Sequence, residues 1–381
     1  APPDDLPLAR HFPNAGFVIM RDSWDFGQNT LLTFKSSSFG SHNHHHLDQN
    51  TFVLYYKGPL AIDSGAYSAM GRYESIHWEN YYTRTVAHNG ILVYDPNENW
   101  GLDPYGRQRS NDGGQRIISQ AEPAPLQMEE TGTHGLTGIV RYENQDDYAY
   151  TVGDATKAYS GKVVDCTRSV VYLRNHSYDH PAIVVYDRVV STNAAFKKTY
   201  LLHSINEPAV AGKTVMVWND DGMSATNKAG LYQQTVLPAD AVLTVVGGRT
   251  NNAEFLVHDD GTGSPRNYND EADYETANER YQRSYREAGQ WRVEVCPGAT
   301  QTNDVFLHVL SVTDDPASHN PVAVDFVGTT NLDGVIVEDP DGTERTLVLI
   351  QKAPGALSET IDLAGKPLFA RCLIFGAAAN T

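Results

Sequence analysis

The residues with the greatest chemical potential form a histidine cluster near the N-terminus. The segment GSHNHHHLDQN contains His42, His44, His45, His46 and Asp48. In an extended chain, residues two apart point to the same side, so His44 and His46 should face one site while His45 turns away. Imidazole side chains bind metals and exchange protons near neutral pH. The cluster therefore predicts a metal site, an acid–base site, or both.

Two further side chains can complete such a metal site. Asp63 ends the strand-like run YYKGPLAI, and His88 comes immediately before a strand that begins near Gly90. His46, Asp63 and His88 would supply two imidazoles and one carboxylate, and zinc accepts such a set with a fourth tetrahedral position open to water or another ligand. The spacing is equally compatible with a solvated histidine loop that binds no physiological metal, and with His88 as an ordinary hydrogen-bonded residue.

Short strands separated by turns must position these side chains. Segments rich in β-branched and aromatic residues recur along the chain and are bounded by Gly, Asn, Asp or Pro, as at 51–56, 90–94, 169–173 and 182–186. This pattern is typical of an all-β fold, here a large antiparallel β-sandwich. The turn-rich segment DDPASHN predicts a boundary, so we expect a β-sandwich domain over 1–313 and a small C-terminal β domain over 314–381.

Composition excludes several classes of protein. The 381 residues carry a formal net charge of −18, which argues against nucleic acid as a partner because phosphate binding relies on clustered Lys and Arg. No apolar run approaches the roughly 18 residues that span a bilayer, so no membrane partner is expected. The three widely spaced cysteines predict neither a disulfide framework nor a thiolate zinc site. A polyanionic substrate would need a local basic patch, or positive charge from outside this chain.

Several longer motifs follow one another in an order that resembles a known enzyme family. After the His-x-His-Leu-Asp run they read YYKGPLAIDSGAY, NYYTRTVAHN, CTRSVVYLR, VVYDRVV, WRVEV and FLHVLSV. This series is similar to the central β-sandwich of the heparinase II/III-like polysaccharide lyases, and most similar to their heparinase II members. The likeness covers essentially the whole chain, including a small C-terminal β domain. The N-terminal α/α toroid of that family has no counterpart in this sequence.

The resemblance implies a role for each residue of the cluster. It assigns His44 to the catalytic histidine and assigns His46, Asp63 and His88 to a structural Zn²⁺ that holds loops in place. The interval between Asp63 and His88 is shorter than the resemblance leads us to expect, so His77 is the competing ligand. The implied reaction is β-elimination beside a uronic acid, with His44 as base or acid.

The same resemblance implies partners and a location. A tyrosine and the groups that neutralise the uronate carboxylate would come from an N-terminal α/α toroid domain or chain, so this chain alone should have an incomplete active site. The substrate would be an acidic polysaccharide, and the enzyme would be periplasmic or secreted. A homo-oligomer is compatible with this picture.

Three residues near the cluster are candidates for substrate binding. Tyr67 and Tyr73 could stack on sugars, and Arg84 could pair with a carboxylate or sulfate group. Each has a structural alternative: ordinary packing for the tyrosines, and pairing with an Asp for Arg84. His203, His258 and His308 occur in strand-like runs and are interpreted as structural residues.

Other functions remain open at this stage. Heparin or heparan sulfate is the closest implied substrate class, but alginate and other uronate polymers fit the same architecture. A cupin-like metal-dependent oxidoreductase also uses His-x-His with a carboxylate and a later histidine, although Asn50 stands where a cupin would have glutamate. A third hypothesis is a non-catalytic carbohydrate-binding β protein in which the metal only joins loops.

Overall fold

The architecture is that of a computed structural model, and its described residues cover most of the chain. They are 6–38, 45–65, 75–103, 105–116, 135–174, 180–219, 228–269, 288–315, 320–338, 342, 345–355 and 371–377. Three of the predicted site residues, His44, Tyr67 and Tyr73, lie outside these ranges.

The N-terminal part of the chain forms an antiparallel meander of five strands. In order they are β1 (Ala9–Phe12), β2 (Phe17–Arg21), β3 (Leu31–Lys35), β4 (Thr51–Tyr55) and β5 (Pro59–Ala61). Buried and half-buried residues alternate along β2 and β3, so one face of this sheet packs on the core. The turn before β2 requires Gly16, whose φ is +67° and where an added Cβ would stand 2.3 Å from the Ser37 Cα. The segment that bears the histidines connects β3 to β4.

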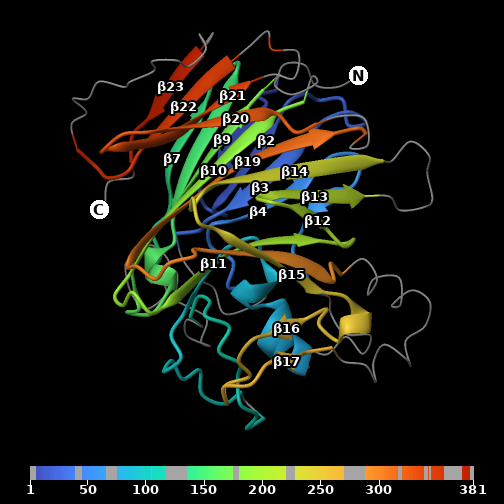
Figure 1. Cartoon of the computed structure of the whole chain (residues 1–381), viewed down its shortest axis with the longest axis vertical. Coiled ribbons are helices and arrows are strands. Elements are labelled where there is room, and N and C mark those ends of the chain that lie inside the picture. The colour runs from blue at the N-terminus through green and yellow to red at the C-terminus, as the bar shows by residue number, and fades with distance from the viewer. Residues whose placement is uncertain are drawn as a thin grey trace.

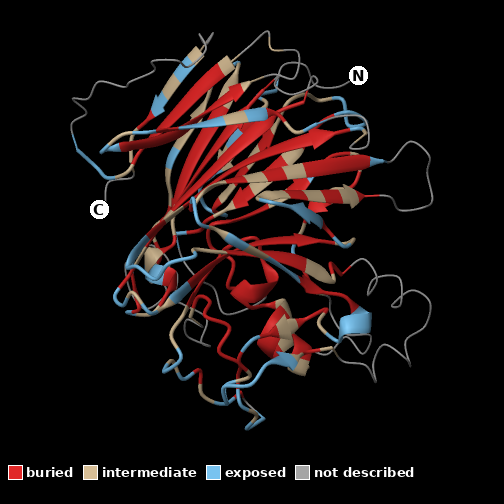
Figure 2. Cartoon of the chain, in the orientation of Figure 1, coloured by how far each residue is buried: buried red, intermediate tan, exposed pale blue. Residues whose placement is uncertain are grey.

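An eight-stranded antiparallel sheet forms the centre of the molecule. Its strands, in spatial order, are β12 (Ala209–Ala211), β13 (Thr214–Asn219), β14 (Ala229–Leu237), β19 (Asn303–Thr313), β10 (Ala182–Ser191), β9 (Val163–Leu173), β8 (Tyr148–Asp154) and β7 (Gly138–Asn144). The middle strands β9, β10 and β19 are buried on both faces, as Figure 2 shows. A strand covered on both sides is mostly apolar, which explains the near-continuous hydrophobic runs in these sequences.

A second four-stranded sheet lies below the central one in the view of Figure 1. It contains, in spatial order, β15 (Val242–Gly247), β18 (Trp291–Cys296), β11 (Lys197–Ser204) and β6 (Ile91–Tyr94). Near it are the short pair β16 (Leu256–Val257) and β17 (Arg266–Asn267), a π-helical turn η1 (Trp78–Tyr82), and the 3-10 turns η2 (Thr85–Ala87), η3 (Thr156–Ala158) and η4 (Arg249–Asn251). The turns η1 and η2 carry the chain from the Asp63 region to His88.

The C-terminal residues form a sheet of their own. It consists of β20 (Ala323–Gly328), β21 (Leu332–Glu338), β22 (Arg345–Gln351) and β23 (Arg371–Phe375). β21 and β22 pair in antiparallel fashion on either side of the sequence DPDGTE, and β23 joins β22 in parallel. Whether 1–313 and 314–381 behave as separate domains stays a prediction.

Two hydrophobic cores hold the layers together. One core joins the N-terminal sheet and the second sheet to one face of the central sheet, through residues such as Phe34, Tyr172 and Leu202. The other core joins the opposite face to the C-terminal sheet, through Tyr150 and Val348 among others. Apolar faces of sheets must be buried against another layer, and here the central sheet is covered by a layer on each face. The prediction of an all-β sandwich is confirmed.

Within the described residues, no helix has the length and apolar character needed to cross a membrane.

Candidate metal centre and active site

The segment that carries His46 and Asp48 is anchored on both sides. Lys35, the last residue of β3, places its Nζ 2.6 Å from each carboxylate oxygen of Asp48. The backbone N–H of Leu47 donates to the Thr83 carbonyl at 2.8 Å, and the Thr85 hydroxyl donates to the Leu47 carbonyl at 2.7 Å. The residues just before His88 are thereby hydrogen-bonded directly to the segment that carries His46.

Asp63 and His88 lie close together, as their positions beside neighbouring strands led us to expect. Asp63 lies just after β5, and His88 follows η2. The backbone N–H of Ser64 donates to the Ala87 carbonyl at 2.8 Å, which holds the two segments side by side. The Nδ1 atom of His88 lies 3.0 Å from Oδ1 of Asp63. His88 is fully buried, whereas the Asp63 side chain is 44% exposed.

The structure brings His46 and His88 into one compact group, and the third member is Asp48. One ligand atom from each of these three residues lies within 4.8 Å of the other two. The rings of His46 and His88 are 5.1 Å apart. This group differs from the predicted set, in which Asp63 is the carboxylate ligand. Asp63 instead contacts Nδ1 of His88.

The other nitrogen of His88 supports a metal at this position. Nε2 of His88 is buried and has no hydrogen-bond partner among the described residues. A buried polar atom without a partner costs about 1–3 kcal/mol, and such atoms are rare in folded proteins. A carboxylate on one imidazole nitrogen commonly orients the opposite nitrogen toward a metal. The donor set therefore fits a zinc ion, with Asp63 either as a ligand or as the group that orients His88.

The electrostatics of the two histidines differ. Burial, reinforced by the nearby His88, lowers the pKa of His46 to about 4, so its ring is neutral at pH 7 and has a lone pair for a metal. Burial also disfavours the charged form of His88, but the Asp63 carboxylate outweighs burial and raises the pKa of His88.

His77, the competing ligand, lies in a different environment. Its Nδ1 is 2.7 Å from the Tyr268 carbonyl oxygen, and its ring packs edge-on against Phe255 at 4.6 Å. Burial lowers the pKa of His77 to about 4. His77 does not belong to the compact group, so the geometry favours His88 as the ligand.

The three remaining histidines of interest have structural partners. Nε2 of His203 lies 2.9 Å from the Val86 carbonyl oxygen, His258 contacts Glu294 at 2.8 Å, and Nδ1 of His308 lies 3.2 Å from the Thr235 hydroxyl. These contacts agree with the structural interpretation of all three.

Arg84 takes the Asp-pairing alternative. Its side chain is 1% exposed, and Nη2 donates to Asp112 at 2.6 Å. The guanidinium also lies 3.8 Å from the centre of the Trp100 ring. Asp112 in turn accepts a hydrogen bond from the backbone of Val86. An arginine that is buried and paired in this way stabilises the turn before His88, and a substrate contact would require it to leave that pair.

We predict that Arg84→Met lowers the free energy of unfolding by about 3–5 kcal/mol, because it leaves the buried Asp112 carboxylate unpaired. Urea unfolding measures this loss. Arg345→Met is the matched control, since the Arg345–Glu338 pair is 28% exposed on both sides and should contribute far less. Unchanged stability in Arg84→Met, together with weaker substrate binding, would restore the ligand role of Arg84.

Sequence reasoning did not single out Lys35, or Asp48 as part of the metal group. Asp48 was recognised on the histidine segment, but its place beside His88 depends on a contact across 40 residues of chain. Lys35 ends a strand whose alternating pattern gave no sign of a buried carboxylate nearby. Charged residues inside apolar strand runs, such as Arg168 in CTRSVVYLR, were a signal of buried partners that the sequence did offer.

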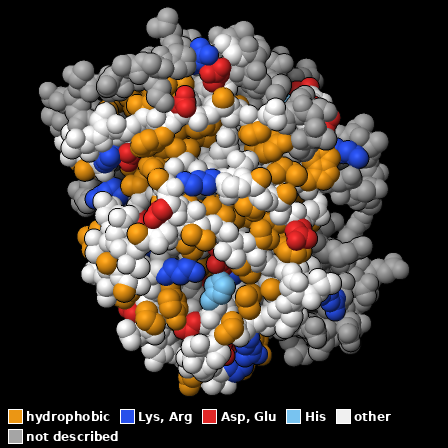
Figure 3. Space-filling model, viewed as in Figure 1, with side chains coloured by type: hydrophobic (Ala, Val, Ile, Leu, Met, Phe, Trp, Pro, Cys, Tyr) orange, Lys and Arg blue, Asp and Glu red, His pale blue; other side chains and the backbone are white. Residues whose placement is uncertain are grey.

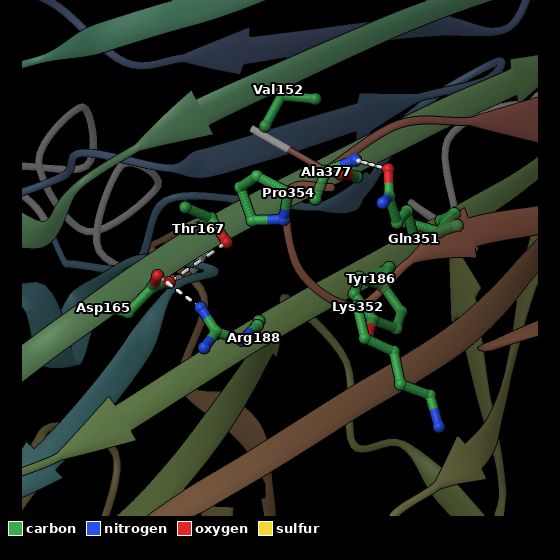
Figure 4. A pocket seen from close by; sticks show the side chains of 11 residues that line it. Val152, Asp165, Thr167, Tyr186, Arg188, Gln351, Lys352, Pro354 and Ala377 are labelled. Carbon is green, nitrogen blue, oxygen red and sulfur yellow. Dashed lines mark hydrogen bonds and ion pairs between the residues drawn. The ribbon is translucent and has the colours of Figure 1, made fainter. Parts of the chain in front are cut away.

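Figure 4 shows a small pocket between the central and C-terminal sheets. Its lining includes Asp165, Tyr186 and Arg188 from the central sheet, and Gln351 and Lys352 from the end of β22. The charged groups are already engaged, because Arg188 pairs with Asp165 and Lys352 contacts Asp333. No histidine is among the residues that line it. This pocket is separate from the candidate metal centre.

On the face drawn in Figure 3, the Lys and Arg side chains of the described residues are scattered among hydrophobic and acidic ones. They do not gather there into one basic patch. The local positive charge that a polyanionic substrate would need is therefore not provided by the described residues of this face.

Comparison with known protein families gives one match. The family described as "Heparinase II/III-like, C-terminal" matches residues 4–287. This interval contains all the predicted catalytic, substrate-binding and metal-binding residues. No curated protein matches the sequence.

Several solved structures share the fold. A heparinase III gene product superposes with a TM-score of 0.57 at 14% identity and covers 91% of this chain. The heparan sulfate lyase HepC from Pedobacter heparinus has a TM-score of 0.57 at 15% identity and covers 92%. A further heparinase III structure has a TM-score of 0.53 at 12% identity and also covers 92%. This chain spans only 42%, 43% and 43% of those three proteins, respectively.

Proposed function

Because the chain belongs to the heparinase II/III-like C-terminal family, we propose that it is the β-sheet part of a polysaccharide lyase that cleaves uronic-acid-containing glycans by β-elimination. The observation that carries the proposal is the meeting of His46, which lies two residues after His44 in the sequence, with His88, whose ring also contacts Asp63. The family resemblance assigns the same three residues to the metal, although the interval between Asp63 and His88 is shorter than it leads us to expect. The relatives of known structure are named as heparinase III and heparan sulfate lyase, which makes heparin or heparan sulfate the first substrate class to test.

We also propose that the compact histidine group holds a structural zinc ion. His46 and His88 would be ligands through imidazole nitrogens, and Asp63 or Asp48 would provide the carboxylate. Bound zinc would fix the connection between β3 and β4 against the turn before β6 and would take no part in bond cleavage. Lys35 competes for Asp48, because it contacts both carboxylate oxygens, and this favours Asp63 as the carboxylate of the metal site.

The chemistry would fall to His44, which is two residues before His46. If the segment is extended, both side chains point to the same side, so fixing His46 also fixes the direction of His44. In β-elimination the C5 proton of the uronic acid moves to a base, the C4–O4 bond breaks, and the departing oxygen receives a proton. The electron pair of the C5–H bond becomes the C4–C5 double bond, and no water is consumed. An imidazole can serve as either base or acid at neutral pH.

A second part is needed to complete this site. Removal of the C5 proton requires that the uronate carboxylate be neutralised, usually by a positive charge. On the face drawn in Figure 3 the described basic residues are scattered and form no such patch. We propose that a helical toroid domain or chain supplies the missing groups, since this chain spans about two fifths of the heparinases it resembles. A periplasmic or secreted location, and a homo-oligomeric assembly, remain proposals of the same kind.

The decisive experiment follows the ultraviolet absorbance of the unsaturated uronate product. Heparin, heparan sulfate and alginate are each incubated with this chain alone and with its helical partner. We expect absorbance to rise on one of the polymers only when the partner is present, because the groups that neutralise the carboxylate would be absent from the chain alone.

The alternatives predict different results, in this assay or in measurements made beside it. A rise on alginate alone would move the proposal to alginate lyase. Sugar binding without any unsaturated product would favour the carbohydrate-binding hypothesis. Oxygen consumption with bound iron would favour the cupin-like oxidoreductase, and either of the last two results would overturn the lyase proposal.

A further inference from the structure

A fully buried arginine joins the two segments that carry the candidate metal ligands. Arg168 lies in the middle of β9 and is 0% exposed. Its Nη1 donates to the Asn50 carbonyl at 2.8 Å and also to the Asn89 carbonyl. Asn50 is two residues after Asp48, and Asn89 immediately follows His88. One guanidinium nitrogen thus holds the main chain of both segments at once.

The direction of this guanidinium is set by Asp187 on the neighbouring strand. Arg168 and Asp187 are register partners in β9 and β10. Nε of Arg168 donates to one carboxylate oxygen at 2.6 Å, and Nη2 donates to the other at 3.1 Å. This bidentate contact leaves Nη1 as the atom that faces the two carbonyls. Asp187 also provides the charge that a buried arginine needs.

The two asparagine side chains extend the same network. Asn50, which has a φ of +57°, donates from Nδ2 to the carbonyls of Gly153 and Cys166 at 3.0 and 3.3 Å. An added Cβ on Gly153 would stand 2.1 Å from the Asn50 side-chain oxygen, so this approach needs a glycine.

On the other side of the network, Asn89 donates to the carbonyls of Phe52 and Ile62 at 2.8 and 3.0 Å. Ile62 precedes Asp63, so the contact reaches the third segment of the candidate centre. The side-chain oxygen of Asn89 accepts from the His203 backbone at 2.7 Å. The segments of His46, Asp63 and His88 are therefore linked by one set of hydrogen bonds, most of them buried.

We propose that Arg168, oriented by Asp187, is a positioning residue that sets the distance between the His46 segment and the His88 segment. The claim that it thereby tunes zinc affinity rests on the proposed function, whereas the positioning of the two segments does not. The physical reason is that two backbone carbonyls, from residues 39 apart in the chain, both accept hydrogen bonds from the same rigid, planar guanidinium. Lysine offers a single ammonium on a flexible stem and cannot satisfy Asp187 and both carbonyls in this geometry.

The test compares Arg168→Lys with Arg174→Lys in the full protein. Arg174 follows β9, is 2% exposed, and also binds backbone carbonyls, those of Arg21 and Tyr148 at 3.1 and 3.0 Å. Both substitutions remove hydrogen bonds from a buried arginine to backbone carbonyls, one within β9 and one just after it. Only Arg168 contacts the segments of the candidate centre. Two quantities are measured: zinc affinity by competition with a chelator, and amide hydrogen exchange of 45–50 and 84–90 without metal.

We expect Arg168→Lys to weaken zinc binding about 10–100-fold, the usual effect of losing a group that orients metal ligands. Amide exchange in both segments should become about tenfold faster or more, since their shared anchor is lost. Arg174→Lys should reduce thermal stability but leave zinc affinity and exchange in these two segments as in the wild type.

The possible outcomes distinguish the positioning role of Arg168 from its effect on zinc affinity. Exchange in 45–50 and 84–90 that is unchanged in Arg168→Lys, or equally faster in Arg174→Lys, would overturn the positioning role. If the wild type binds no zinc but exchange responds only to Arg168→Lys, the zinc proposal fails and the positioning role stands. If Arg168→Lys does not fold, Asp187→Asn replaces it, because it keeps the side-chain size and should speed amide exchange in the same two segments. If Asp187→Asn does not fold either, the Arg168–Asp187 pair supports the whole sandwich, and a specific positioning role is overturned.

Discussion

Replacing His88 by alanine should reduce bound zinc from about one ion per chain to almost none. His88 is fully buried, its Nε2 has no partner among the described residues, and Asp63 contacts its other nitrogen. Losing one of two imidazole ligands leaves too few donors for a structural site. His46→Ala should have the same effect. Elemental analysis of protein purified without a histidine tag measures the metal content directly.

His308→Ala is the matched control for this experiment. His308 is also 0% exposed, and Nε2 of its ring also has no hydrogen-bond partner among the described residues, but it lies in the central sheet near Thr235. Its removal should cost stability and leave zinc content unchanged. Zinc retained in both His46→Ala and His88→Ala would exclude the assigned centre.

The two nearby carboxylates can be separated in the same way. Asp63→Ala should abolish zinc binding if Asp63 is a ligand, and should weaken it only about 10–100-fold if Asp63 merely orients His88. Asp48→Ala should have the smaller effect, because Lys35 already occupies both oxygens of Asp48. A complete loss of zinc in Asp48→Ala alone would make Asp48 the ligand.

His44→Ala should remove most of the lyase activity while leaving the fold and the zinc in place. This variant is made in the protein that contains the helical domain, and turnover is followed by the absorbance of the unsaturated uronate. Losing a general acid or base typically reduces the rate about 10²–10⁴-fold, because the proton transfer at C5 or O4 then lacks a positioned partner.

His45→Ala is the neighbouring control for His44. In an extended segment His45 points to the opposite side, so its replacement should leave turnover close to that of the wild type. Near-normal turnover in His44→Ala would remove His44 from the mechanism. Loss of zinc in His44→Ala would instead make His44 part of the metal site.

Local sequence patterns were enough to predict much of the fold. Strands with a polar–apolar period of two, such as β2 and β3, and apolar runs bounded by turns, such as β10, can be recognised from neighbouring residues alone. The pairing of β21 with β22 has the same local origin, because turn-forming residues stand between two apolar runs. Each of these features depends on interactions within a short stretch of chain.

The sequence by itself also determined which residue types could form the candidate centre, through the spacing of the histidine segment and the positions of Asp63 and His88 beside strands. Only the tertiary structure decided which of these groups meet. The compact group contains Asp48, Arg84 is buried against Asp112, and Arg168 joins two distant turns. A charged residue in an apolar context needs a partner, but sequence does not say whether that partner is a ligand or another side chain. That choice depends on strand register and layer packing across tens to more than a hundred residues, which no local pattern encodes.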